Sequence, residues 1–150
     1  DTTSEERDEL FERFEARWRD EPLVLDKWFA LEATSRRTGT LQRVRALLSH
    51  PGFNARNPNR VRALVGAFAL ANFARFHAED GSGYAFVADQ VLALDGLNPQ
   101  LAARVAGAFE LWKRLPEPRR GRVAVELKRI AAAPALSPDV TEIVTRSLAD

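Results

Sequence analysis

The most informative part of this 150-residue sequence is the stretch Asn57-Pro58-Asn59-Arg60-Val61-Arg62-Ala63-Leu64-Val65-Gly66-Ala67-Phe68-Ala69. A similar stretch follows, Asn98-Pro99-Gln100-Leu101-Ala102-Ala103-Arg104-Val105-Ala106-Gly107-Ala108-Phe109. The two begin 41 residues apart, at positions 57 and 98, which is the period expected of solenoids built from two- or three-helix repeats. The alternative is a chance likeness between two alanine-rich helices. The similarity favours an α-helical repeat protein.

Both stretches start as helices do. Asn57 and Asn98 are favourable N-caps because an asparagine side-chain oxygen accepts a hydrogen bond from the free N–H groups of the first turn. Proline follows each asparagine, at the first helical position, where a missing N–H costs nothing. Further on, we expect the Gly-Ala pair in Gly66-Ala67-Phe68 and in Gly107-Ala108-Phe109 to let a neighbouring helix approach closely. The phenylalanine would fill the space beside it.

The composition is that of a soluble globular protein, with 45% hydrophobic and 29% charged residues. We expect residues 1–150 to form a single domain, since this length is enough to bury a core. A net charge of +1 argues against a general nucleic-acid or membrane surface, and no stretch approaches the ~20 apolar residues that span a bilayer. The lack of cysteine excludes disulfides and thiolate metal sites. Because the sequence contains no methionine, even at position 1, we expect it to be part of a longer protein.

Apolar periodicity and capping signals predict about eight helices and no strands. The first opens at the capping box Thr3-Ser4-Glu5-Glu6; the others cover 22–31, 41–48 (capped by Thr40), 58 to about 72, a segment ending near 95, 99 to about 114, a segment ending near 133, and one opening at Ser137-Pro138. Residues 73–84 are too glycine-rich for a helix. We therefore predict an all-α domain in which antiparallel helix pairs form a superhelical α-solenoid of the HEAT/armadillo type.

His77, Glu79 and Asp80 are the first candidates for chemistry, as a metal or acid–base cluster. Their spacing matches no common ligand pattern, and a hard cation would need more converging oxygens. The alternative is structural, with the carboxylates capping the next helix and His77 bonded to a loop carbonyl. His50, beside a proline at a helix end, indicates a C-terminal cap.

Motifs of several enzyme classes are absent. The sequence has no cysteine, no G-x-S-x-G, no H-E-x-x-H, no P-loop and no dinucleotide fingerprint. Arg36-Arg37 and Arg119-Arg120-Gly121-Arg122 could contact phosphates, or they could be solvated turns. Nothing in the sequence predicts a catalytic residue.

Arg62 and Arg104 form a second candidate, because each lies in the early turns of an Asn-Pro-capped helix, with Gln100 one turn before Arg104. If the two repeats stack, both helix N-termini point the same way. The guanidinium groups then join free N–H groups and positive dipole ends in an anion-binding corner. The alternative is that both arginines pair with local carboxylates such as Glu79 or Asp80.

Three stretches, DEPLVLDKWFA (20–30), NPNRVR (57–62) and FHAEDGSGY (76–84), together resemble the C-terminal helical domain of bacterial aminopeptidase N, a family of zinc-dependent alanyl aminopeptidases with a gluzincin catalytic domain. The resemblance runs from about residue 20 to the end. It implies that zinc, the H-E-x-x-H helix and the glutamate ligands lie in a preceding catalytic domain. The C-terminal domain would be an α-solenoid that closes over that site and admits short or flexible peptides.

The resemblance also assigns residues. Arg62, Gln100 and Arg104 match family positions that face the enclosed cavity, where they would hold the carboxylate or backbone of a bound peptide. No catalytic residue, metal ligand or cofactor carries over to this chain, so we expect it to hydrolyse nothing alone. The implied parent is a cytoplasmic zinc metalloaminopeptidase of peptide catabolism. Its C-terminal domain would have the upstream catalytic domain and peptide substrates as partners, without nucleic acid or membrane.

Two further interpretations remain at this stage. The first is a free-standing helical-repeat scaffold whose concave face binds a protein partner, and the second is nucleic-acid binding through the arginine turns, which predicts steep salt dependence. An exposed apolar patch on the first two helices, around Trp18, Trp28 and Phe29, would suit either a scaffold or a domain contact.

Overall fold

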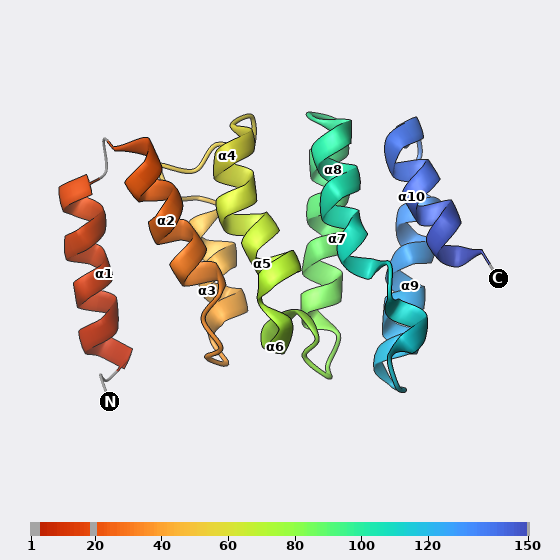
Figure 1. The fold of residues 1–150 in the computed structure, drawn as a ribbon, viewed down its shortest axis with the longest axis horizontal. Coiled ribbons are helices and arrows are strands. Elements are labelled where there is room, and N and C mark those ends of the chain that lie inside the picture. The colour runs from red at the N-terminus through yellow and green to blue at the C-terminus, as the bar shows by residue number, and fades with distance from the viewer. Residues whose placement is uncertain (1–3, 19–20, 150) are drawn as a thin grey trace.

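The computed structural model describes residues 4–18 and 21–149, and all regular structure in these ranges is helical (Figure 1). The α-helices are α1 (Ser4–Trp18), α2 (Pro22–Ala33), α3 (Thr40–Leu47), α4 (Pro58–Val61), α5 (Ala67–Ala71), α6 (Phe73–Phe76), α7 (Ser82–Asp95), α8 (Pro99–Ala106), α9 (Arg119–Ala131) and α10 (Pro138–Leu148). A π-helical segment, η1 (Arg62–Gly66), joins α4 to α5, so that residues 58–71 form one rod. Two 3-10 segments, η2 (Gly107–Phe109) and η3 (Trp112–Arg114), follow α8.

The helices stand side by side in two layers along the long axis, with the two ends of the chain at opposite ends of the molecule (Figure 1). One layer contains α2, the rod 58–71, α8 and α10, and the other contains α3, α7 and α9. Within this array α2 packs on α3 and η1, α7 packs on α8 and α9, and α10 packs on α8 and α9. The predicted all-α solenoid is therefore confirmed. None of the described helices is both long and apolar enough to cross a lipid bilayer.

The capping prediction for the two similar stretches is confirmed. The Asn57 side chain accepts a hydrogen bond from the backbone N–H of Arg60 at 3.3 Å, and Asn98 accepts one from the N–H of Leu101 at 3.1 Å. Figure 1 shows α4 and α8 starting at the same edge of the molecule. The two helix N-termini therefore point the same way.

The predicted role of the glycine pairs is wrong. A Cβ atom added at Gly107 would meet nothing within 4 Å, and one at Gly66 would touch only its own helix, at 3.8 Å. The phenylalanines behave as expected, since Phe68 and Phe109 are fully buried. The repeats are thus held together by side-chain packing rather than by close backbone contact at these glycines.

Residues 73–84, predicted to be irregular, contain the short helix α6 and the start of α7. Asn72 ends the preceding rod and caps α6, because its side-chain oxygen accepts from the N–H of Arg75 at 3.1 Å. Gly81 has φ = 78°, a left-handed conformation that glycine adopts without strain. A Cβ at Gly83 would lie 2.4 Å from the carbonyl oxygen of Phe76, so this glycine marks the closest approach of α6 to α7. The glycines that suggested a loop instead allow a tight turn and a close contact between α6 and α7.

Two other boundary predictions also differ. The helix expected to run to about residue 114 ends at Ala106 and tightens into η2. Thr40 is the first residue of α3 rather than its cap; Gly39 occupies the N-cap position, and no side chain caps this end. The capping box at the start of the chain includes Thr3, which lies outside the described residues.

The expected exposed patch around the first two helices is not observed as predicted. Trp28 and Phe29 are buried, at 2% and 0% exposure, because α2 is covered by α3 and the rod 58–71. The side chain of Trp18 lies outside the described part. The large apolar side chains that are exposed on these two helices instead include Leu10 of α1 and Leu23 of α2.

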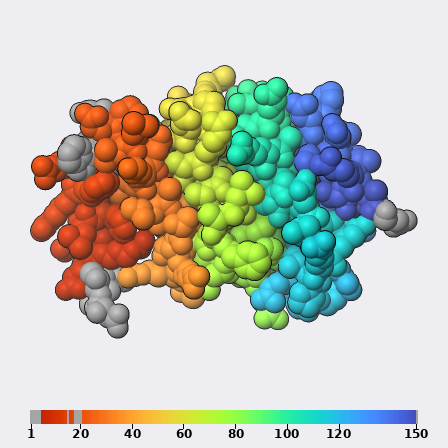
Figure 2. Space-filling view, viewed as in Figure 1, coloured from red at the N-terminus to blue at the C-terminus, as the bar shows by residue number. Residues whose placement is uncertain are grey.

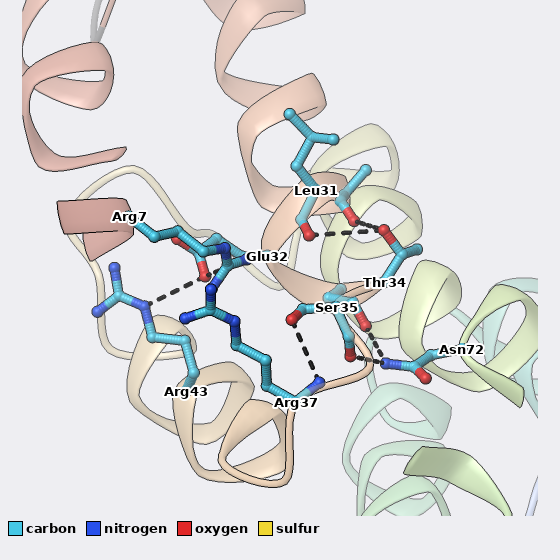
Figure 3. A network of polar contacts seen from close by, with 10 residues as sticks. Arg7, Leu31, Glu32, Thr34, Ser35, Arg37, Arg43 and Asn72 are labelled. Atoms are coloured by element: carbon cyan, nitrogen blue, oxygen red, sulfur yellow. Dashed lines mark hydrogen bonds and ion pairs between the residues drawn. The ribbon is translucent and has the colours of Figure 1, made fainter. Parts of the chain in front are cut away.

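A buried polar network joins the N-terminal helices (Figure 3). The carboxylate of Glu32 in α2, 1% exposed, lies 3.5 Å from Arg43 of α3 and 3.9 Å from Arg7 of α1. On the other side of α2, the Asn72 side-chain amide donates to the carbonyl oxygens of Ala33 and Ser35, at 2.8 and 2.7 Å. Since a buried charge is tolerated only when paired, Glu32 ties three helices together.

Candidate functional site

Arg62 and Arg104 line one groove between the rod 58–71 and α8. The groove has a volume of about 270 Å³ and is lined by Arg62, Gly66, Ala67, Leu70, Ala71, Leu101, Arg104 and Val105. Arg62 is the first residue of η1 and Arg104 lies in the last turn of α8, and both side chains are exposed. The structure thus brings together two of the three site residues predicted from the sequence.

The third predicted residue, Gln100, is exposed near the start of α8 and is not part of the groove lining. It precedes Arg104 by one turn on the same helix. The structure therefore does not place Gln100 in the groove with the two arginines.

Neither arginine is neutralised by a carboxylate within the described ranges. Arg62 donates to the neutral side chain of Asn59 at 3.3 Å. Asp80, an alternative partner considered from the sequence, instead accepts from the backbone N–H and hydroxyl of Ser82, at 2.9 and 2.6 Å. Glu79 is exposed and forms no ion pair with Arg104 among the residues that the structure describes. The positive charge of the groove is available to an anion.

A larger, mainly apolar pocket of about 410 Å³ adjoins this groove. It is lined by Ala69, Leu70, Phe73, Phe76, His77, Tyr84, Gly107, Ala108, Phe109, Glu110, Leu111, Trp112, Arg114, Leu115 and Val123. Leu70 lines both spaces, so they lie next to each other along the same rod. Figure 2 shows the yellow-green segment near residue 70 beside the teal segment near residue 110 on one face. We refer to the two spaces as the arginine groove and the apolar pocket.

A hydrogen-bonded pair forms the polar part of the apolar pocket. Nδ1 of His77 lies 2.7 Å from the hydroxyl of Tyr84, so His77 does not bind a loop carbonyl as predicted. Burial, together with the positive charge of Arg119, lowers the pKa of His77 below 6.5. Burial raises the pKa of Tyr84. Both groups are therefore neutral at pH 7, and they offer hydrogen bonds to a ligand rather than charge.

The acidic part of the predicted cluster is structural. Asp80 caps the start of α7 through Ser82, and these hydrogen bonds lower the pKa of its carboxyl group. Among the described residues, no group of three or more His, Asp or Glu side chains is placed to hold a metal ion. His77, Glu79 and Asp80 thus do not form a metal site in this structure.

The arginine turn at residues 119–122 is bound to the protein and is not a simple solvated turn. Arg119 donates to the carbonyl of His77 at 2.7 Å, and Arg122 donates to the carbonyl of Asp80 at 2.5 Å. Arg120 pairs with Glu117 at 3.1 Å. These bonds fix the loop before α7 against the start of α9, and with it the position of the His77 ring.

His50 belongs to the core rather than to a site. Its Nδ1 accepts from the backbone N–H of Gly52 at 2.8 Å, closing the turn after α3. Its ring packs against Trp28 and Phe29, with centroids 5.2 and 5.5 Å away. The prediction of a C-terminal cap therefore differs from the structure, because Leu48 is the C-cap residue of α3 and Nδ1 of His50 accepts from a turn N–H rather than donating to a helix carbonyl.

The apolar pocket could not be found from the sequence. Its residues come from four separate parts of the sequence, and the exposed Phe73 and Leu111 look like core residues in any apolar pattern. The arginine groove was predictable because each of its two cations follows an Asn-Pro cap by one to two helical turns, five residues after Asn57 and six after Asn98.

The family model described as "Domain of unknown function (DUF3458_C) ARM repeats" matches residues 1–149. The chain belongs to this family. The term ARM repeats agrees with the two-layered helical array and with the 41-residue spacing of the two similar stretches.

Three proteins to which the chain is similar are aminopeptidases. It is 45% identical to aminopeptidase N of Caulobacter vibrioides over 142 residues, and 42% identical to aminopeptidase N of Escherichia coli over 143 residues, each match covering 95% of this chain. A crystal structure of Legionella pneumophila aminopeptidase A in complex with aspartic acid matches 96% of the chain with a TM-score of 0.90 and 33% identity. The resemblance to the C-terminal region of aminopeptidase N is therefore confirmed.

The match covers only a part of each relative. The chain spans 16% of the length of the two aminopeptidase N sequences and 17% of the Legionella chain. The relatives' names describe those whole proteins.

Proposed function

We propose that this chain is the closing domain of a zinc-dependent, cytoplasmic aminopeptidase N, which removes N-terminal residues from peptides. The catalytic zinc and its ligands would be supplied by another domain of the same polypeptide. Support comes from the 40–45% identity to three bacterial aminopeptidase N sequences across 95% of the chain. The chain as a single domain would contribute no catalytic residue and would cap the cavity that holds the substrate.

The arginine groove supports a more specific proposal about how the domain binds a substrate. Two guanidinium groups from successive repeats face one 270 Å³ space without a carboxylate partner among the described residues. A guanidinium matches a carboxylate geometrically, and such charge-assisted hydrogen bonds are about twice as strong as neutral ones. We propose that Arg62 and Arg104 hold the C-terminal carboxylate of a bound peptide and that Gln100, one turn before Arg104 on α8, contacts its backbone.

This role would select substrates by length and by terminal charge. A peptide bound at both ends places its free amine near the zinc and its carboxylate near the arginines. A substrate without a carboxylate would lose only the second contact. The arginines would thus affect peptides more than uncharged amides.

The test is to compare Arg62→Ala and Arg104→Ala in the intact enzyme with the matched control Arg56→Ala. Arg56 is exposed on the loop before α4 and lines neither the arginine groove nor the apolar pocket. We expect kcat/KM for alanyl peptides with a free carboxylate to fall about tenfold relative to the same peptides amidated, since a charged hydrogen bond contributes about 1.5–3 kcal/mol. Equal losses on acid and amide, or the same loss in Arg56→Ala, would refute the carboxylate role.

A further inference from the structure

Three hollows that share lining residues lie beside the rod 58–71 and α6, and we refer to them together as the channel. The arginine groove meets the apolar pocket at Leu70. The apolar pocket meets a third space of about 300 Å³, and both are lined by Phe73, His77 and Leu115. The channel is therefore longer than a binding place for one terminal carboxylate requires.

The middle of this channel exposes large apolar side chains. Leu70, Phe73 and Leu111 are 55%, 76% and 64% exposed, whereas 28 hydrophobic residues of the described ranges are buried in the core. A contiguous apolar surface of this kind, with polar groups at its edge, is typical of a ligand-binding groove. Trp112 forms a half-buried wall of the same pocket, and its indole N–H is already bonded to the carbonyl of Ser147 at 2.8 Å. Because the indole N–H already has a partner within the protein, Trp112 presents an apolar surface to a group bound in the pocket.

The charges around the channel indicate the kind of ligand. Besides Arg62 and Arg104 at one end, Arg114 lines the apolar pocket and Arg119 lines the third space. Glu110, the acidic residue in the pocket lining, is paired with Arg146 at 3.2 Å. The channel complements a ligand that is apolar along its length and negatively charged.

The spacing suits an extended peptide. Arg62 and Leu70 are eight residues apart on one helical rod, which corresponds to at most about 12 Å, because the α-helical rise of 1.5 Å per residue is an upper value for a stretch that includes the π-helical residues 62–66. An extended chain advances about 3.3 Å per residue. The residue opposite the apolar pocket is therefore three or four positions before a carboxylate bound at the arginines.

We propose that the apolar pocket around Leu70, Phe73 and Trp112 is a side-chain subsite of the peptide channel. It takes a large apolar residue, phenylalanine or leucine, located three or four positions before the C-terminal carboxylate. The inference rests on the proposed function, since it uses the same peptide orientation. It adds a preference for a side chain far from the cleaved bond.

The test uses the intact enzyme and alanyl heptapeptides made of alanine, with a single phenylalanine placed at each position from the second to the last before the C-terminus. We expect kcat/KM to be about tenfold higher when phenylalanine stands three or four positions before the carboxylate, because burying a phenyl ring contributes on the order of one pKd unit or more. The double variant Leu70→Ala/Phe73→Ala is expected to lose this preference to within about twofold. Its folding is preserved because both side chains are largely exposed.

Val125→Ala is the matched control, because Val125 is 63% exposed on α9 and lines none of the three spaces. It should keep the full preference. A preference that survives in Leu70→Ala/Phe73→Ala, or that is absent from the unaltered enzyme, would overturn the subsite. An equal loss on all peptides and on a short alanyl amide would also overturn it, because it would mean that another part of the polypeptide covers the patch.

The two proposals fail separately in these measurements. If the acid and amide forms respond equally to Arg104→Ala, the carboxylate role fails regardless of the phenylalanine scan. If that difference is present and the scan is flat, the carboxylate role holds and the apolar subsite is refuted.

Discussion

Replacement of Gly83 by alanine is expected to destabilise the fold strongly. A Cβ atom at this position would lie 2.4 Å from the carbonyl oxygen of Phe76, 2.6 Å from that of Arg75 and 2.8 Å from the Cα of Phe76. All three atoms belong to the backbone of α6, so none can move away by a rotamer change. Either α6 or α7 must shift as a unit.

The size of that shift sets the expected cost. Moving the nearest oxygen to ordinary contact at about 3.4 Å requires a displacement of about 1 Å. The displacement would disturb the packing of Phe76 on Tyr84, whose rings are 5.1 Å apart. Overpacking a core usually costs about 1–3 kcal/mol. Because backbone has to move, we expect about 3 kcal/mol, which corresponds to a decrease in Tm of roughly 6–12 °C for a domain of this size.

Urea and thermal unfolding of the chain, followed by circular dichroism, measure this loss. Gly107→Ala is the control, because Gly107 has helical dihedral angles and a Cβ there would meet nothing within 4 Å. It should leave stability unchanged or raise it by about 0.5–1 kcal/mol through a smaller unfolded-state entropy. If Gly83→Ala unfolds within 1 kcal/mol of the unaltered chain, the close approach of α6 and α7 is wrong.

Three further predictions concern the polar groups that hold the site in place. Asn72→Ala should lower the free energy of unfolding by about 3 kcal/mol in urea titrations, since three hydrogen bonds are lost. The control Asn98→Ala loses a single helix cap and should cost about 1 kcal/mol. Equal losses in the two variants would contradict the hydrogen-bond network of Asn72. Asp26→Ala should cost about 3 kcal/mol in the same assay, because the buried guanidinium of Arg60, 2.7 Å from Asp26, loses its carboxylate partner and keeps the Gly52 carbonyl as an acceptor. A loss below 1 kcal/mol would contradict this. The NMR titration midpoint of His77 should lie below 6.5, because burial and Arg119 disfavour its charged form. As the pH drops, the unfolded chain therefore takes up the proton before the folded chain does. The free energy of unfolding should then fall as the pH drops below about 6.5, and level off below the lowered pKa of the folded state. A midpoint at or above 6.5 would refute that environment.

Much of the fold follows from local signals in the sequence. The Asn-Pro caps at residues 57–58 and 98–99 mark helix starts correctly, because capping depends on residues within one turn. The apolar periodicity likewise locates the buried faces of α9 and α10. The family resemblance rested on three short motifs, and the comparisons confirmed it.

The errors arise where a residue's role depends on distant parts of the chain. Gly83 looks like a loop residue, although it is required by backbone from α6 that packs against it. Trp28 and Phe29 suggest an exposed patch until α3 and the rod 58–71 cover them. The apolar pocket is also invisible in the sequence, because its walls meet only after the repeats stack.

The most direct test of the central proposal is an aminopeptidase assay on an alanyl chromogenic amide with added zinc. The 150-residue chain would be assayed alone, and then mixed with the separately produced remainder of its parent polypeptide. We expect no turnover by the chain alone and restored or increased activity on mixing, as for the closing domain of a two-part enzyme. Turnover by the purified chain alone, or no change in the activity of the remainder on mixing, would contradict the proposal.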